Sequence, residues 1–195
     1  MKKRVFLLLV LSSLVLSACS GGTYQAVTEV VEQENSNTDD EFNQYLGYVP
    51  EEVLEAITSF GYTIHLVDSL DKQYNLKYVS GLTIPEIKEI WIESNAEKYR
   101  QTVVHEVFHA FDHSLGFISG SSEFIAIYDE EKELMQVTGF ISAGQYKANE
   151  KEYFAEACQM YVYDANTLKQ SAPKTYEYIK NLLEEVDNYG KSGSR

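Results

Sequence analysis

The feature that most constrains this sequence is a His-Glu-x-x-His segment formed by His105, Glu106 and His109. Four residues make slightly more than one helical turn, so on a helix the two imidazoles project from the same face and can share one metal ion. Zinc accepts neutral imidazole nitrogen, and a hydrolytic zinc site needs only three protein ligands, which leaves a fourth position for water. Glu106 would take the proton of that water as general base. The pattern predicts metal-assisted hydrolysis of a peptide bond.

This interpretation requires a helix, and the flanking residues favour one. Asn95 can cap its start, and Gly116 provides a left-handed stop after Leu115. The alternative is an amphipathic helix with two incidental histidines, but apolar residues flank the motif, and histidines buried among them would need partners. We therefore expect a metal-binding helix of about five turns. Its apolar flank consists of Val103, Val104, Val107, Phe108, Ala110 and Phe111.

The N-terminus has the pattern of a bacterial export signal. Three basic residues at positions 2–4 precede an apolar run over residues 5–16, which is too short to span a bilayer comfortably. The following Leu-Ser-Ala-Cys at 16–19 resembles the lipobox of bacterial lipoproteins, in which cleavage before the cysteine leaves that cysteine lipidated. We expect residues 1–18 to be a lipoprotein signal peptide and Cys19 to carry the lipid, which would anchor the protein to the outer face of the cell membrane. The alternative, an ordinary secretory peptide with a chance cysteine, also implies export.

Charge and cysteine content limit the partners of the mature chain. The 195-residue sequence has a net charge of −14, and removal of residues 1–18 takes away three basic and no acidic residues, which leaves −17. Nucleic acid and anionic membrane surfaces would repel such a chain, so we expect no nucleic-acid partner and membrane attachment only through the N-terminal lipid. Besides Cys19, Cys158 is the one remaining cysteine, which excludes an intramolecular disulfide. We expect a monomer.

Composition divides the mature chain into a tether and one folded domain. Residues from Gly21 to about Glu41 are mostly polar and cannot bury enough surface to offset their ordering entropy. We therefore expect a lipid-anchored flexible stalk over residues 19–41, with a short helix at 28–34 as the competing interpretation. The domain over residues 42–195 is long enough for one core of normal size.

The first part of this domain has the pattern of one helix and several short strands. Pro50 suits a first helical turn, and Gly61 suits the end of that helix. His65 lies in the first strand, where a structural imidazole is favoured over a metal ligand. These strands would form a small sheet beside the His-Glu-x-x-His helix. The apolar stripe of the helix is Val53, Leu54, Ile57 and Phe60; the strands are expected in Tyr62–Val67 and in parts of Leu76–Val79 and Glu89–Ile92, with turns at Gly81 and Pro85.

The second part has the pattern of three helices. Ser121 or Ser122 can cap a helix that runs to about Met135. A further helix is expected from about Asn149 to Ala165, and Pro173 can begin the last one.

The third metal ligand must come from outside the motif. His113 has drifted about 80° around the helix from His105, which makes joint coordination awkward, and Asp112 better suits a helix-end hydrogen bond. Downstream, Glu152 and Glu156 share one helix face, so one can bind zinc while the other accepts a hydrogen bond from a ligating imidazole. Alternatively, Glu152 is a capping-box carboxylate that reaches back toward the start of its helix, although a cap would not explain the second glutamate.

Three blocks together resemble the protease domain of anthrax toxin lethal factor and the secreted Pro-Pro endopeptidases of Gram-positive bacteria. They are His-Glu-x-x-His at 105–109, Asn-Glu-x-Glu-Tyr-Phe-Ala-Glu-Ala at 149–157 and Ala-Pro-Lys-Thr-Tyr-Glu-Tyr-Ile at 172–179. The resemblance covers roughly residues 60–188. It implies a zincin-like α+β fold, mainly helical, with a small mixed sheet beside the His-Glu-x-x-His helix and a sheet edge that can hold substrate as an added strand.

Residue by residue, the resemblance implies a complete site. The Zn²⁺ ligands would be His105, His109 and Glu152, with Glu106 as the base and Glu156 as a supporting carboxylate. In that family a tyrosine upstream of the glutamate ligand stabilises the oxyanion, and the tyrosine in the corresponding stretch is Tyr146, one residue closer to the ligand than the family pattern. The loop over residues 139–147 must therefore differ from that of the family.

These observations predict a zinc-dependent endopeptidase at the bacterial cell surface that acts on extracellular proteins or peptides. One alternative is a lipoprotein that kept the fold as a binding module without turnover, and the intact Glu106 disfavours it. Another is a zinc-scavenging or structural zinc protein. Zinc content alone does not separate these alternatives, whereas peptide hydrolysis that depends on Glu106 does.

Overall fold

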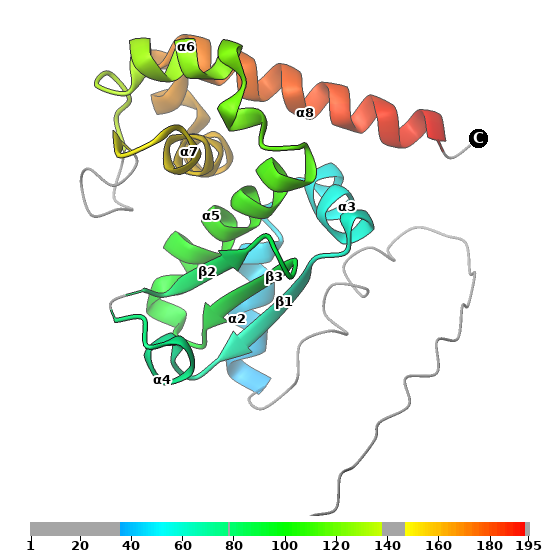
Figure 1. The fold of residues 1–195 in the computed structure, drawn as a ribbon, viewed down its shortest axis with the longest axis vertical. Coiled ribbons are helices and arrows are strands. Elements are labelled where there is room, and N and C mark those ends of the chain that lie inside the picture. Colours follow the sequence, from blue (N-terminus) through cyan, green and yellow to red (C-terminus); the bar gives the residue numbers. More distant parts are fainter. Residues whose placement is uncertain (1–35, 78, 138–146, 194–195) are drawn as a thin grey trace, which may run out of the picture.

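Helix α5 (Ala96–Ser114) runs through the middle of the molecule, and most other elements pack around it (Figure 1). The computed structural model describes residues 36–77, 79–137 and 147–193. A small sheet lies on one side of α5, and helices α7 and α8 lie toward the other. In chain order the remaining elements are α2 (Ser36–Leu46), α3 (Glu51–Phe60), β1 (Thr63–Val67), α4 (Leu70–Tyr74), β2 (Gly81–Ile84), β3 (Glu89–Glu93), the 3-10 helix η1 (Ile118–Gly120), α6 (Ser122–Glu131), α7 (Glu150–Ser171) and α8 (Pro173–Gly193).

The sheet is mixed and has the order β1-β3-β2. Strand β1 pairs with β3 in parallel, and β2 pairs with β3 antiparallel, with Thr83 opposite Ile90. Ile64, Ile90 and Ile92 are buried, and this face of the sheet packs on α5. The predicted fold class, α+β and mainly helical with a small mixed sheet beside the motif helix, is confirmed.

The middle strand of the prediction was misplaced. The prediction of a strand in Leu76–Val79 is wrong, because none of the described residues in this segment lies in a strand. Helix α4 precedes the segment and β2 follows it. Helix α4 ends at Asn75, which adopts a left-handed conformation with a φ of 56°. Gly81, expected in a turn, is the first residue of β2, whereas the expected turn at Pro85 lies between β2 and β3.

Helix α2 lies across the expected boundary between the stalk and the domain. Helix α2 starts at Ser36, so its first turns overlap the stalk expected over residues 19–41. Phe42 and Leu46, one turn apart, are buried, and the Phe42 ring packs edge-on against Tyr99 of α5. The polar residues before them extend the same helix. The signal peptide, Cys19 and the remainder of the stalk lie outside the described residues.

Helix α3 follows its prediction closely. It begins after Pro50 and ends at Gly61, whose φ of 97° requires a residue without a side chain. Three members of its stripe are buried, whereas Phe60 is 37% exposed. Within the described ranges, no helix is both long enough and apolar enough to cross a bilayer.

Helices α6 and α7 differ from expectation at their C-terminal ends, whereas α8 begins at Pro173 as expected. Ser121 caps α6 by accepting a hydrogen bond from Phe124 N. This helix ends at Glu131 instead of Met135, and the buried Glu131 carboxylate accepts hydrogen bonds from the backbone amides of Lys174 and Thr175 at the start of α8. The helix expected to end near Ala165 continues to Ser171 as α7, with a break at Asp164, whose φ and ψ are not helical.

Candidate active site and metal centre

Helix α5 carries the two histidines on the face that meets α7. The apolar flank predicted for this helix is buried throughout, which fixes its orientation. The side chains of His105 and His109 are 15% and 19% exposed. Their Nε2 atoms lie 3.0 Å apart, and the two rings are nearly perpendicular. The motif therefore points two imidazole nitrogens at one position, as its spacing predicts.

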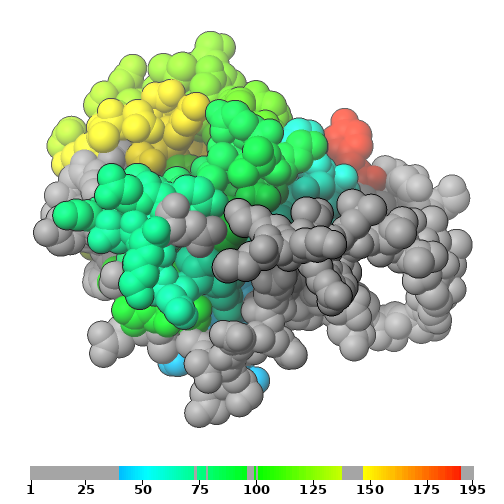
Figure 2. Space-filling view, turned by 60° about the horizontal axis from the view of Figure 1, so that its bottom comes forward, coloured from blue at the N-terminus to red at the C-terminus, as the bar shows by residue number. Residues whose placement is uncertain are grey.

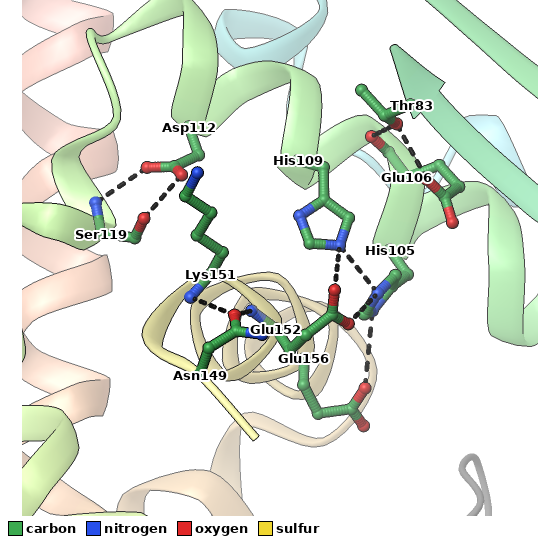
Figure 3. Close-up of polar contacts among 10 residues, drawn as sticks. All are labelled: Thr83, His105, Glu106, His109, Asp112, Ser119, Asn149, Lys151, Glu152 and Glu156. Carbon is green, nitrogen blue, oxygen red and sulfur yellow. Dashed lines mark hydrogen bonds and ion pairs between the residues drawn. The ribbon is translucent and has the colours of Figure 1, made fainter. Parts of the chain in front are cut away.

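Helix α7 brings a carboxylate to the same position. Glu152 Oε2 lies 3.4 Å from His105 Nε2, and Glu152 Oε1 lies 3.6 Å from His109 Nε2 (Figure 3). The helix is capped by Asn149, whose Oδ1 accepts hydrogen bonds from the backbone amides of Lys151 and Glu152, each at 3.0 Å. Both Glu152 carboxylate oxygens face the histidines, so this side chain is directed at His105 and His109 and does not reach back to the start of α7 as a capping box would require.

These three side chains fit a divalent metal ion. One ligand atom from each of His105, His109 and Glu152 can be chosen so that all lie within 4.8 Å of one another. Tetrahedral zinc with ligand distances near 2.0–2.1 Å places its donor atoms about 3.3 Å apart, close to the separations found here. Two imidazole nitrogens that face each other also need a proton or a cation between them. The donor set, two imidazoles and a carboxylate, is one that zinc accepts in catalytic sites.

The carboxylates around the histidines favour positive charge at that position. Burial lowers the pKa of His105, but its close contacts with the Glu152 and Glu156 carboxylates and the nearby negative charge of Glu106 outweigh burial and raise this pKa to about 10. Interaction with the two imidazoles holds the pKa of Glu152 well below its usual range. A metal ion must displace the proton, so its affinity is expected to fall as the pH is lowered.

Glu156 lies on the other side of the His105 ring. Its Oε2 is 3.6 Å from His105 Nδ1, whereas Glu152 faces Nε2 (Figure 3). Glu156 is fully buried, and neither carboxylate oxygen has a hydrogen-bond partner among the described residues. Such a carboxylate can orient the imidazole and fix its tautomer, which is the supporting role predicted for Glu156.

Glu106 points away from α7 and toward the sheet. Its side chain is largely buried, and Thr83 Oγ1 lies 2.8 Å from its Oε2 (Figure 3). The sequence interpretation did not include Thr83, which lies 23 residues away along the chain. Gly81 also contacts this region and was interpreted as a turn residue. A glycine inside a strand often marks the close approach of another element, so Gly81 was the sequence signal that could have indicated the contact between this strand and α5.

The other histidines have structural surroundings. The Tyr62 hydroxyl and His113 Nδ1 share a hydrogen bond of 2.6 Å, and burial together with nearby carboxylates raises the pKa of Tyr62 to about 12. His65 stacks on Trp91. Neither histidine belongs to the metal-binding group found among the described residues. Asp112 accepts hydrogen bonds from the backbone and hydroxyl of Ser119, which supports the role expected for it at the helix end.

Two further predicted residues lie outside the described part of the chain. Tyr146, the candidate oxyanion tyrosine, falls within residues 138–146, and Cys19 falls within residues 1–35. Both assignments stay predictions.

Comparisons with known proteins agree with this geometry. A family model described as anthrax toxin lethal factor, N- and C-terminal domain, matches residues 75–182, more than half of the chain. The chain is 28% identical over 166 residues to the Pro-Pro endopeptidase of Paenibacillus alvei, covering 72% of this chain and 75% of that protein. A solved structure of the Pro-Pro endopeptidase from Paenibacillus alvei matches with a TM-score of 0.61 and 25% identity, covering 80% of this chain and 98% of the solved chain. The expected zincin-like fold is confirmed.

Proposed function

We propose that this chain, which belongs to the anthrax toxin lethal factor family, uses zinc to cleave extracellular proteins or peptides. Family membership and the similarity to Pro-Pro endopeptidases make the chain a metalloendopeptidase. The observation that carries the proposal for zinc is the convergence of His105, His109 and Glu152 on one position, with Glu106 next to His105 in α5. The substrate and the extracellular location are inferred.

The residues of the site divide the chemical work. His105, His109 and Glu152 would hold the zinc ion, which when bound polarises the scissile carbonyl and acidifies water. Glu106 would take a proton from the attacking water and deliver it to the leaving amine. Glu156, behind His105, would keep that imidazole in the tautomer that presents Nε2 as a ligand. Tyr146 remains the candidate for stabilising the oxyanion.

The geometry of the sheet suggests how substrate would bind. Strand β2 is an edge strand in the described sheet and packs on α5 beside the catalytic motif. An extended peptide could add to this edge through main-chain hydrogen bonds, which would place its backbone beside the metal-binding residues. In the space-filling view, the chain segment that contains the sheet (teal to green) and the start of α7 (yellow) reach the surface on the same face of the molecule (Figure 2). This arrangement supports an endopeptidase that accepts extended segments.

The names of the relatives suggest a first substrate to test. Because the similar Paenibacillus alvei protein is a Pro-Pro endopeptidase, we expect cleavage between two consecutive prolines. The zinc-loaded protein would be incubated with matched peptides that contain Pro-Pro, Pro-Ala, Ala-Pro or Ala-Ala at the same position, and the products identified by mass spectrometry. Hydrolysis of the Pro-Pro peptide at that bond is the expected result. Cleavage at other bonds only would contradict the specificity, and no cleavage across a broad peptide library would contradict the function.

We further propose that the protein is exported and held at the outer face of the cell membrane by a lipid on Cys19. The basic start, the short apolar run and the cysteine at the cleavage point support this location. Cys19→Ala should release the protein into the medium or leave the precursor unprocessed, as judged by fractionation and by mass. Cys158→Ala is the matched control and should not alter fractionation. Unchanged membrane association of Cys19→Ala would contradict a lipid anchor.

A further inference from the structure

Strand β2 contacts the general base directly, through two residues on one face. Gly81 and Thr83 are two positions apart in the strand, so both project toward α5. Their partners in β3 are Ile92 and Ile90, which are both buried on the α5 side of the sheet. The edge strand is thus positioned to act on Glu106.

The first contact is a hydrogen bond. Thr83 Oγ1 lies 2.8 Å from Glu106 Oε2 and 2.9 Å from the Glu106 backbone carbonyl oxygen. A threonine hydroxyl has one proton, so it donates to one of these acceptors at a time. A hydrogen bond to a carboxylate is stronger than one to a neutral carbonyl, so the ionised side chain is the preferred acceptor.

The second contact is steric. A Cβ atom at Gly81 would overlap Thr102 Cγ2 and would lie 2.6 Å from Glu106 Cγ and 3.0 Å from Glu106 Oε1. Gly81 is therefore needed because of the space that Thr102 and Glu106 together occupy. A side chain at this position would force Glu106 or the strand to move.

We propose that β2 positions the catalytic base: Thr83 holds Oε2 of Glu106, and Gly81 leaves the space in which this side chain lies. This inference rests on the proposed function of Glu106 as the base. Thr83 is a positioning residue, because it acts through Glu106. Strand β2 would then have two roles. Its outer edge is the proposed docking site for substrate, and its α5-facing side holds the Glu106 side chain in place.

The contribution of the hydroxyl can be tested with variants of similar size. Thr83→Val removes the hydroxyl, Thr83→Ser keeps it, and Thr63→Val on β1 is the matched control in the same sheet. We expect Thr83→Val to keep its zinc content, thermal stability and KM, while kcat falls on the order of 10- to 100-fold, as for misplacement of a catalytic group. Thr83→Ser should restore most of kcat, and Thr63→Val should resemble wild type. Wild-type kcat in Thr83→Val would overturn the inference.

Crystal structures supply a measurement that does not depend on turnover. The Glu106 carboxylate should lie against Thr83 in the wild type and in Thr83→Ser, and should be displaced in Thr83→Val and in Gly81→Ala. If wild-type protein proves inactive but the carboxylate still moves in Thr83→Val, the proposed function fails while the positioning role stands. An unmoved carboxylate in Thr83→Val would overturn the positioning role whatever the activity. If Gly81→Ala does not fold, the Thr83 variants still decide the question.

Discussion

Replacement of Glu106 by glutamine is expected to lower kcat by about 10²- to 10⁴-fold, the usual contribution of a general base. The amide keeps the shape of the side chain and can still accept the hydrogen bond from Thr83, but it cannot take a proton from water. Zinc content and thermal stability should stay close to wild type, because Glu106 is not among the three metal-binding residues. Steady-state kinetics on a cleaved peptide, with metal analysis of the same preparation, measure both quantities.

The control for this substitution is Glu123→Gln, which makes the same chemical change on the exposed surface of α6. It should leave kcat unchanged. Near-normal turnover by zinc-loaded Glu106→Gln would exclude Glu106 as the base and would leave the part-buried hydrogen bond from Thr83 without a catalytic role.

The two glutamates of α7 should respond differently to substitution. Glu152 faces the Nε2 atoms of both histidines, so its replacement by alanine would leave two imidazoles as the only protein ligands of a metal ion. The Glu152→Ala protein should therefore be purified largely zinc-free. Glu156 faces Nδ1 of His105 only, and loss of such an outer partner typically costs about 10- to 100-fold in metal affinity or activity. Glu156→Ala should therefore retain zinc at reduced affinity.

Competition with a chelator would rank these variants. Glu150→Ala, in the first turn of the same helix, is the control for Glu152→Ala, and Glu156→Gln tests whether the buried volume or the charge matters at that site. The expected order of zinc affinity is wild type, then the Glu156 variants, then Glu152→Ala. The reverse order would exchange the roles of the two glutamates and shift the assignment along α7 by one helical turn.

Local sequence patterns predicted the helices that carry the metal-binding residues. The spacing of His105 and His109 makes them neighbours on any helix, and Gly116 marks the end of that helix. Asn149 marks the start of α7 in the same way, and Glu152 and Glu156 then follow on one face. Each of these relations spans only a few residues, so the sequence contains it directly.

The contact between β2 and α5 could not be predicted from local sequence patterns. The contact between Thr83 and Glu106 depends on the register of β2 and on how closely this strand packs against α5. The apolar pattern that favoured a strand in Leu76–Val79 is short. In the structure this segment follows the end of α4 at Asn75, and β2 begins only at Gly81. The helical residues before Phe42 could not be predicted from burial, because only Phe42 and Leu46 signal burial in α2.

The most direct test of the account is restoration of activity by zinc. Purified protein without residues 1–19 would be stripped of metal with a chelator, and zinc would be added in steps while bound metal and peptide hydrolysis are both measured. Hydrolysis should be absent at the start, rise in proportion to bound zinc and reach its maximum at one zinc per chain, whereas His105→Ala should gain neither. Full hydrolysis by the zinc-free protein, or none by the protein with one zinc bound, would contradict the assignment of His105, His109 and Glu152 as a catalytic metal centre.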